Sequence, residues 1–207
     1  MSPKATKTPT ALAPAPVQPA VANVPDGFAQ ISTLFNVEAP PQARIKLSVA
    51  GEFTPPVNPD YKFRKELLRA IIMWNHGVGG PNIMLVGPSG TGKSSLIEQF
   101  CARLNKEVFV VQCHGRMEPA HFCGQIGLCE GTTGSTITKW SDGPLVKAMK
   151  RGAAVILDEY DMLPPDTSAW LHRLRDERRV LVPETGELVT AAPDFRLAVT
   201  ANTLGQG

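Results

Sequence analysis

The segment GPSGTGKS, residues 87–94, restricts the fold of this chain more than any other stretch of its sequence. It matches the pattern G-x-x-x-x-G-K-[ST], in which the backbone N–H groups of a glycine-rich loop surround phosphate oxygens. Such a loop is expected between a buried strand and a helix. NIMLV at 82–86 is typical of that strand, and the residues after the loop give a helix one apolar face: Leu96, Ile97, Phe100, Cys101 and Leu104. The segment therefore predicts an α/β fold with a phosphate-binding loop.

The same loop predicts the ligand. Lys93 is expected to reach the outer phosphates of a nucleotide, and the Ser94 hydroxyl to coordinate Mg²⁺. A loop of this kind reads phosphates and not the base, but the sequence has no clear Asn-Lys-x-Asp motif for guanine. We therefore expect the ligand to be ATP with Mg²⁺.

A second motif, AAVILDEYD at 153–161, predicts the catalytic carboxylates. Residues 153–157 are expected to form a buried strand, after which Asp158 would hold Mg²⁺ and Glu159 would polarise the attacking water. Two adjacent carboxylates at a strand end can also be merely solvated. Their position after a phosphate loop favours the catalytic interpretation, and so predicts a hydrolase.

A third strand is expected in FRLAVTAN at 195–202, and it ends in Asn202. An Asn at this position can be a simple turn former. However, α/β proteins bind their ligands at the carboxyl ends of parallel strands. The strand ends at Gly87, Asp158 and Asn202 therefore predict one shared site, with Asn202 within reach of the γ-phosphate or the water.

The rest of the chain divides into three regions. Residues 1–27 are rich in Ala and Pro and are predicted to be disordered. In residues 28–59, prolines are expected to break any regular element, so that this segment wraps the surface. Residues 60–207 are expected to form the core domain. It would begin with a helix whose apolar face is formed by Phe63, Leu67, Ile71 and Trp74.

Tyr61 and Phe63, in the segment that leads into this first helix, could flank the adenine. Residues 125–140 and 178–191 each show the alternation and turn residues of a hairpin. On the helix that follows Pro165, three apolar residues are expected to face the core: Trp170, Leu171 and Leu174. The arginines at its end either face a neighbouring subunit or are solvated: Arg173, Arg175, Arg178 and Arg179.

A cysteine- and histidine-rich stretch invites a zinc interpretation through Cys113, His114, His121, Cys123 and Cys129. Its spacing lacks the C-x₂-C pair of common zinc sites. Buried thiols and exposed imidazoles are the favoured interpretation.

Composition excludes few functions, but it indicates the structural class of the protein. The chain has 207 residues, 43% of them hydrophobic, and a net charge of +2, which is typical of one globular domain with a tail. That balance of charge does not indicate nucleic-acid or membrane binding. The four cysteines and the lack of a long apolar segment lead us to expect a cytoplasmic, thiol-reduced protein.

Together, the segments GPSGTGKS, VILDEYD and TAN resemble the motifs of the AAA+ ATPases, which are P-loop NTPases with a three-layer fold. Within them the chain resembles the MoxR branch, through SDGPLVKAMKRG before the second motif and FRLAVTAN after it. PDYKF, IEQFCARLN and DEYD are similar to the CobS-type small ATPase subunit of the aerobic cobaltochelatase. The resemblance covers residues 32–207.

The resemblance implies a five-stranded parallel sheet with a helical lid, assembled as a homo-oligomeric ring of six. It implies that Asp158 and Glu159 hold the metal and activate water, and that Asn202 senses the γ-phosphate. The two hairpins would face the pore or a partner, or would be plain surface hairpins. Phosphate binding is assigned to the whole loop: Gly87, Pro88, Ser89, Gly90, Thr91, Gly92, Lys93, Ser94 and Ser95.

One departure from the family pattern is the position of the last residue. The chain ends five residues after Asn202, before the fifth strand, the arginine finger and the C-terminal lid that the family would supply. Because an arginine finger contributes about 10³ or more in rate, we expect weak hydrolysis from such a chain.

Three functions remain open at this point. The first is the motor subunit of a chelatase that inserts metal into a corrinoid ring, acting with a larger chelatase subunit. The second is a MoxR-type chaperone that remodels a metalloenzyme client. The third is a truncated nucleotide-binding or assembly module without turnover.

Overall fold

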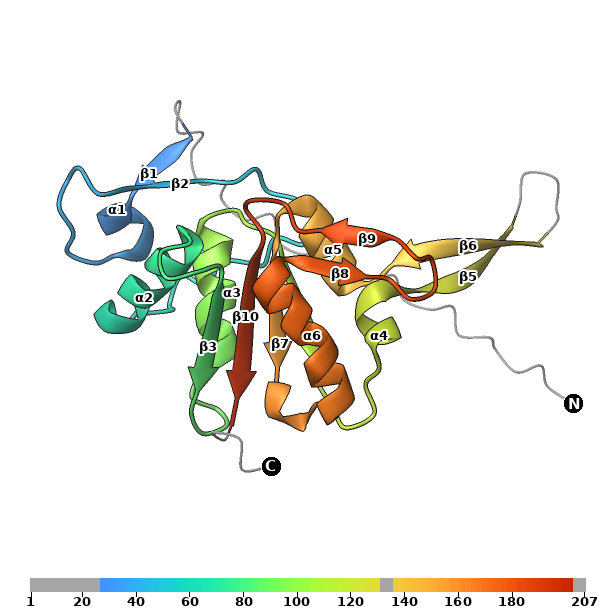
Figure 1. The fold of residues 1–207 in the computed structure, drawn as a ribbon. Helices are drawn as coiled ribbons and strands as arrows, with labels where there is room; N and C mark the ends of the chain where they lie inside the picture. The colour runs from blue at the N-terminus through green and yellow to red at the C-terminus, as the bar shows by residue number, and fades with distance from the viewer. Residues whose placement is uncertain (1–26, 131–135, 203–207) are drawn as a thin grey trace, which may run out of the picture.

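A parallel four-stranded sheet forms the centre of the computed structural model, which describes residues 27–130 and 136–202 (Figure 1). In spatial order its strands are β3 (Asn82–Val86), β10 (Arg196–Ala201), β7 (Ala154–Asp158) and β4 (Val108–Gln112). All four run in the same direction, so their carboxyl ends lie along one edge. The predicted strands are confirmed, while the disorder expected for residues 1–26 falls outside the described residues.

Helices cover both faces of this sheet and give three layers. On one face lie α1 (Ile31–Phe35), α2 (Lys65–Asn75) and α3 (Lys93–Arg103). On the other lie α4 (Pro119–Cys123), α5 (Pro144–Arg151) and α6 (Pro165–Glu177). A hydrophobic core lies on each face of the sheet, and strand β7 contributes to both. Ile156 packs toward the first set of helices, and Val155 and Leu157 pack toward the second. The predicted three-layer α/β architecture is confirmed.

The ends of two helices follow directly from the sequence. Pro144 and Pro165 occupy the first positions of α5 and α6, where a missing N–H costs no hydrogen bond. Gly152 ends α5 in the left-handed conformation, with φ 71°. A 3₁₀ turn, η1 (Tyr160–Met162), connects β7 to α6.

The segment before the core domain contains regular elements, so the prediction of none was wrong. It forms β1 (Phe28–Gln30), α1 and β2 (Arg44–Lys46), with β1 and β2 paired antiparallel. The prolines fall between these elements or after them and interrupt none: Pro40, Pro41, Pro55, Pro56 and Pro59. Phe35 and Ile45 are buried against α2 and α3, so this segment contributes to the core.

Helix α2 buries a different face from the one predicted. Leu68, Ile71 and Trp74 are buried, whereas Leu67 is 40% exposed. The sequence KELLRAIIMWN allows either leucine to continue the spacing, and packing against β3 and α3 selects the second. Phe63 precedes the helix and packs edge-on against Phe35. The apolar face predicted for α3 is confirmed, since all five of its residues are buried.

Both predicted hairpins are present. Strands β5 (Gly124–Glu130) and β6 (Thr136–Asp142) project from the body of the molecule (Figure 1). Strands β8 (Arg179–Leu181) and β9 (Leu188–Thr190) pair beside α6. Leu171 and Leu174 of α6 are buried as predicted, while Trp170 is only half-buried.

The cysteine- and histidine-rich stretch agrees with the favoured interpretation where it is described. Cys113 and Cys123 are buried, and His114 and His121 are exposed. Burial raises the pKa of both thiols to about 12, which keeps them protonated. The side chain of Cys129 lies outside the described residues. Over the described ranges, no cluster of His, Cys, Asp and Glu is arranged to hold a metal, and no helix is both long and apolar enough to cross a membrane.

Candidate functional site

The loop at residues 87–94 joins the end of β3 to the start of α3. Gly90 and Gly92 have φ of 77° and 80°, in the left-handed region that residues with a Cβ rarely adopt. They allow the chain to turn back toward the sheet, and α3 then begins at Lys93. The N–H groups of the first turn of this 11-residue helix point toward the loop and create an anion-binding concavity.

Lys93 lies at the centre of the site. Its Nζ donates hydrogen bonds to the carbonyl oxygens of Gly87 and Pro88, at 2.8 and 3.0 Å, and to Asn202 Oδ1 at 3.0 Å. The last bond connects the loop to the end of β10 across 109 residues of sequence. The predicted meeting of the loop with Asn202 therefore occurs in the structure.

Asp158, at the end of β7, is held from two sides. Ser94 Oγ donates to Asp158 Oδ1 at 2.7 Å, and Thr200 Oγ1 donates to the same oxygen. Thr200 is fully buried on β10, and its hydroxyl also accepts a hydrogen bond from the Glu159 backbone N–H at 3.2 Å. One threonine thus fixes the position of both carboxylate residues.

Glu159 is presented by a constrained backbone. It has φ 56° and ψ 45°, a left-handed conformation that is uncommon for a residue with a side chain and that occurs preferentially at functional sites. Gln112 Nε2, at the end of β4, donates to Glu159 Oε2 at 2.7 Å. Asn202 Nδ2 donates a longer bond to Oε1, at 3.4 Å. The carboxylate is therefore held between two amides, while Asn202 presents its oxygen to Lys93.

The four strands account for this convergence. Pairing aligns Gln112 with Asp158 across β4 and β7, and Val86 with Ala201 across β3 and β10. Gln112 and Asp158 end their strands, Glu159 and Asn202 follow directly, and the loop brings the start of α3 to the same carboxyl edge of the sheet.

Glu98 brings a further carboxylate close to the site. Glu98 on α3 is half-buried, and its burial, together with the charge of Asp158, raises its pKa. A site that already concentrates carboxylates in this way favours the binding of a cation.

A cleft of about 760 Å³ extends from the loop along the segment that precedes α2. Tyr61 lines this cleft, and burial raises the pKa of its hydroxyl against the opposing charges of Arg103 and Arg64. Phe63 is not part of the lining, because it packs against Phe35 in the core. Of the two aromatic residues considered for the adenine, the geometry favours Tyr61 alone.

The remaining loop residues have simpler surroundings. Thr91 Oγ1 donates to the Pro88 carbonyl at 2.8 Å and closes the loop on itself. Ser89 and Ser95 are exposed, and neither side chain makes a polar contact within the described part of the chain.

Sequence reasoning missed Gln112 and Thr200. Thr200 has a signal in the sequence, because it is a polar residue within the apolar strand RLAVTA, whereas Gln112 is an exposed residue at the end of VFVVQ. A buried polar side chain needs a hydrogen-bond partner, and the partners of Thr200 are the Asp158 carboxylate and the Glu159 backbone N–H.

Residues 82–207, more than half of the chain, match the family described as "AAA domain (dynein-related subfamily)". The chain belongs to this AAA family. Membership implies nucleotide binding, in agreement with the loop, and confirms the resemblance on which the sequence motifs were interpreted. The family match begins at the first residue of β3 and includes every polar residue of the site described above.

Curated relatives of this AAA chain include proteins of several kinds. It is 37% identical over 121 residues to Protein NorQ of Paracoccus denitrificans, which covers 58% of this chain and 43% of NorQ. It is 35% identical over 130 residues to the denitrification regulatory protein NirQ of Stutzerimonas stutzeri, covering 62% and 44%. It is 30% identical over 190 residues to the aerobic cobaltochelatase subunit CobS of Sinorhizobium sp, covering 90% and 55%. The chain thus spans about half the length of these relatives.

A solved structure shares the fold. A protein of Cytophaga hutchinsonii, described as an ATPase, superposes with a TM-score of 0.53 at 16% identity, covering 69% of this chain and 40% of that one. The predicted AAA+ P-loop fold is confirmed, with four strands of the central sheet in the described part of the chain.

Proposed function

We propose that this AAA chain binds ATP with Mg²⁺ and hydrolyses it, and that the conformational change acts on a partner protein within an oligomeric ring. The observation that carries this proposal is a connected set of hydrogen bonds at the ends of β7 and β10 and the start of α3: Lys93 to Asn202, Asn202 to Glu159, and Ser94 to Asp158. A solvated surface cluster has no need of a buried threonine beneath its carboxylates.

Lys93 and the backbone of its loop would bind the β- and γ-phosphates. The ammonium already lies in the mouth of the loop, where its present acceptors are carbonyl oxygens and one amide oxygen. Phosphate oxygens are stronger acceptors for an ammonium than these neutral groups, since a charged pair makes shorter and stronger hydrogen bonds. Tyr61, in the lining of the cleft, would contact the base.

Ser94 and Asp158 would hold the metal. Their oxygen atoms are 2.7 Å apart, and hydroxyl and carboxylate oxygens are the ligands that Mg²⁺ prefers. When bound, the ion supplies charge neutralisation to the phosphates. Glu159 lies one residue further along the chain and would accept a proton from the attacking water, with its orientation fixed by Gln112.

Thr200→Val tests the buried support of this metal site. Valine has nearly the same shape but cannot donate to Asp158 Oδ1 or accept from the Glu159 N–H. Because partners of metal ligands affect affinity strongly, we expect the Mg²⁺ requirement for ATP binding to rise by about tenfold or more. Mg²⁺ titrations of ATP binding would measure this.

Thr190→Val is the matched control, since Thr190 is exposed on β9. Its Mg²⁺ titration should superpose on that of the parent. If Thr200→Val remains folded and its titration also superposes, Thr200 does not support a metal site.

The three relatives favour two different kinds of client. The alignment with CobS covers 90% of this chain, so it includes residues that precede the start of the family match at residue 82. It favours a subunit of a cobaltochelatase-type complex that works with a larger subunit on a corrinoid ring. The alignments with NorQ and NirQ are shorter but of higher identity, and NirQ is a regulatory protein. They favour a MoxR-type chaperone that activates a metalloenzyme. We propose the first and retain the second as the alternative.

The deciding experiment measures Mg²⁺-dependent ATP turnover of the full 207-residue chain, alone and with each client. We expect turnover that rises on addition of the large chelatase subunit, together with co-elution of the two proteins. A rise with a metalloenzyme client alone would favour the chaperone. ATP binding without turnover under every condition would contradict hydrolysis and leave a nucleotide-binding assembly module.

A further inference from the structure

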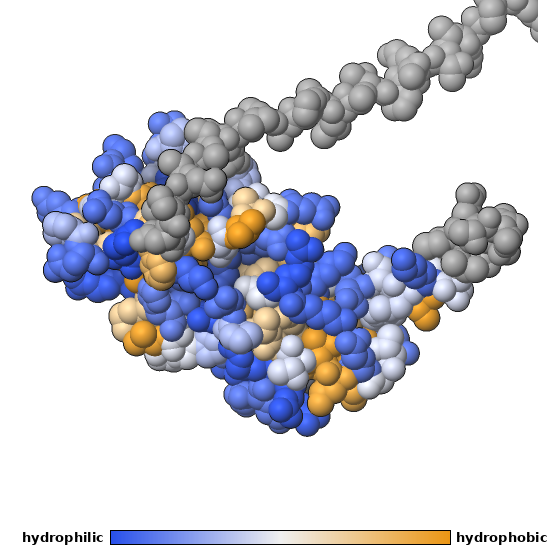
Figure 2. All heavy atoms as spheres, turned by 90° about the horizontal axis from the view of Figure 1, so that it is seen from above, coloured by the Kyte–Doolittle hydropathy of each residue, from blue (hydrophilic) through white to orange (hydrophobic). Residues whose placement is uncertain are grey.

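A second cavity, of about 520 Å³, lies at the opposite edge of the sheet from the nucleotide loop, where the central strands begin. We call it the rear cavity. The ends of α2, α3 and α5 and the start of β10 surround it, and Figure 2 views the molecule from this side, where the surface is mainly hydrophilic. Its ionisable lining residues are Lys46, His76, Lys106, Arg151, Asp194 and Arg196.

Arg196 is buried in the wall of the rear cavity, with only 8% of its surface exposed. Its Nε donates to the carbonyl oxygens of Trp74 and Asn75, at 2.9 and 3.0 Å. Its Nη1 donates to those of Pro193 and Phe195, both at 2.8 Å. Its Nη2 makes no hydrogen bond to any residue in the described ranges, although this edge of the guanidinium carries two donors.

Lys106 is equally buried, with 6% of its surface exposed. Its Nζ donates one hydrogen bond, to the Asp194 carbonyl oxygen at 2.7 Å, whereas an ammonium has three donors. Burial, with a smaller contribution from the charge of Arg196, lowers the pKa of Lys106 to about 8. Two buried cations that repel each other in one cavity wall are unfavourable unless an anion compensates them.

The charges around the rear cavity do not balance. The charge of Arg151 is balanced by Glu107, which accepts hydrogen bonds from its Nε and Nη2 at 2.7 and 2.6 Å. Asp194 is then the one carboxylate in the lining that can balance the positive charges of Lys46, Lys106 and Arg196. Cations near helix C-termini are common because they complement the helix dipole. That role accounts for the Nε of Arg196, which bonds to the last carbonyls of α2, but leaves Nη2 directed elsewhere.

We propose that the rear cavity binds a phosphate group, held by Arg196 Nη2 and Lys106 Nζ, with Lys46 at its rim. Arginine and lysine are the side chains that recognise this group most often, one as a planar fork and the other as a point charge. The volume exceeds that of a free phosphate, so the same cations can also hold the phosphoryl group of a small organic molecule. This site is distinct from the nucleotide site, since it contacts β10 at Arg196, five residues before the catalytic edge at Ala201.

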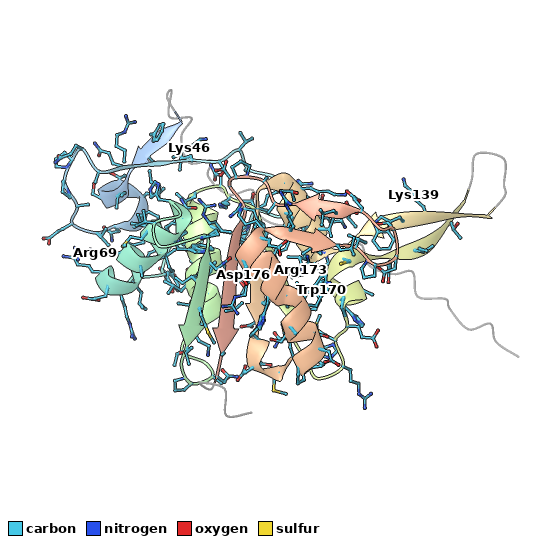
Figure 3. All side chains as sticks on the ribbon, viewed as in Figure 1. Lys46, Arg69, Lys139, Trp170, Arg173 and Asp176 are labelled. Carbon is cyan, nitrogen blue, oxygen red and sulfur yellow. The ribbon has the colours of Figure 1, made fainter. Side chains whose placement is uncertain are left out.

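Calorimetric titration of the full chain with inorganic phosphate tests the proposal. All proteins would carry Lys93→Ala, so that the nucleotide loop contributes little to the signal. We expect Lys106→Gln to weaken phosphate binding by about tenfold or more, because it removes a charged hydrogen bond from a buried site. Lys139→Gln is the matched control: Lys139 extends from β6 far from Lys46 (Figure 3), and its loss should change affinity by less than about twofold.

Equal phosphate affinities with and without Lys106→Gln, or no binding at millimolar phosphate, would overturn the proposal. If Lys106→Gln proves unfolded in a thermal melt, Lys46→Gln decides instead. That lysine is exposed, so its loss should weaken binding by about two- to fivefold, and an unchanged affinity would overturn the proposal. Ribose 5-phosphate, titrated in parallel, identifies the source: tighter binding than inorganic phosphate indicates an organic phosphate, and equal binding indicates the free ion.

Discussion

The Lys93→Ala variant is expected to lose affinity for Mg²⁺-ATP by about 100-fold or more. Lys93 Nζ lies between the loop and Asn202, and its three donors bond to two loop carbonyls and one amide oxygen, acceptors that phosphate oxygens would replace. Each charged hydrogen bond to phosphate contributes about 1.5–3 kcal/mol, and tenfold in affinity corresponds to about 1.4 kcal/mol, so the loss of two such bonds is sufficient. Equilibrium binding of a fluorescent ATP analogue to the full chain would measure the loss.

Lys65→Ala is the matched control for this prediction. Lys65 is an exposed lysine on α2, paired with Glu38 at 3.1 Å, so its removal changes the net charge equally without touching the loop. It should bind the analogue with the affinity of the parent. Parent-like binding by a folded Lys93→Ala protein would show that GPSGTGKS does not bind phosphates in this chain.

The candidate site at the carboxyl edge of the sheet was predictable because its polar residues follow the strands whose ends the topology brings together. Asp158 and Asn202 end apolar runs that are typical of strands, Lys93 follows the glycine-rich loop after a third, and parallel strands bring their carboxyl ends together. Gln112 ends a strand as well, but nothing in VFVVQ distinguishes it from a solvated residue until the partner strand is known. Its role depends on alignment with Asp158, which local sequence does not specify.

The errors lie where tertiary packing chooses between equivalent local patterns. Leu67 and Leu68 both continue the helical spacing, and the choice between them is made by the surface against which α2 packs. Similarly, β2 is only three residues long and lies between prolines. The burial of Ile45 against α3 stabilises this short strand. Thr200 was missed for a third reason, since its two partners are distant in sequence.

The rear cavity and the proposed nucleotide site share two structural elements, β10 and α3. Strand β10 begins at Arg196 in the wall of the rear cavity and ends beside Asn202 at the nucleotide site, and α3 begins at Lys93 and ends three residues before Lys106. Arg196 therefore begins the strand, and Lys106 closely follows the helix, whose opposite ends lie at the proposed nucleotide site. A ligand in either site would restrict the same strand and the same helix.

Glu159→Gln is expected to separate binding from turnover. The amide keeps the size of the side chain but cannot accept a proton from water, and general-base catalysis contributes about 10²–10⁴ in rate. We therefore expect turnover to fall by about 100-fold or more, with ATP affinity changed little, because Glu159 Oε1 and Oε2 bond to Asn202 and Gln112 and not to the phosphate loop. Single-turnover hydrolysis and equilibrium binding on the same preparation would measure the two quantities.

Two control variants test whether the loss of turnover is specific to the Glu159 carboxylate. Glu177→Gln removes an exposed carboxylate at the end of α6 and should leave turnover unchanged. Gln112→Ala removes the 2.7 Å bond that orients Glu159 but leaves the base itself, so turnover should change by less than about tenfold. If Glu159→Gln hydrolyses ATP at the parental rate, the base is another group. If Gln112→Ala instead matches the loss in Glu159→Gln, orientation of the carboxylate by β4 is as necessary to hydrolysis as its charge.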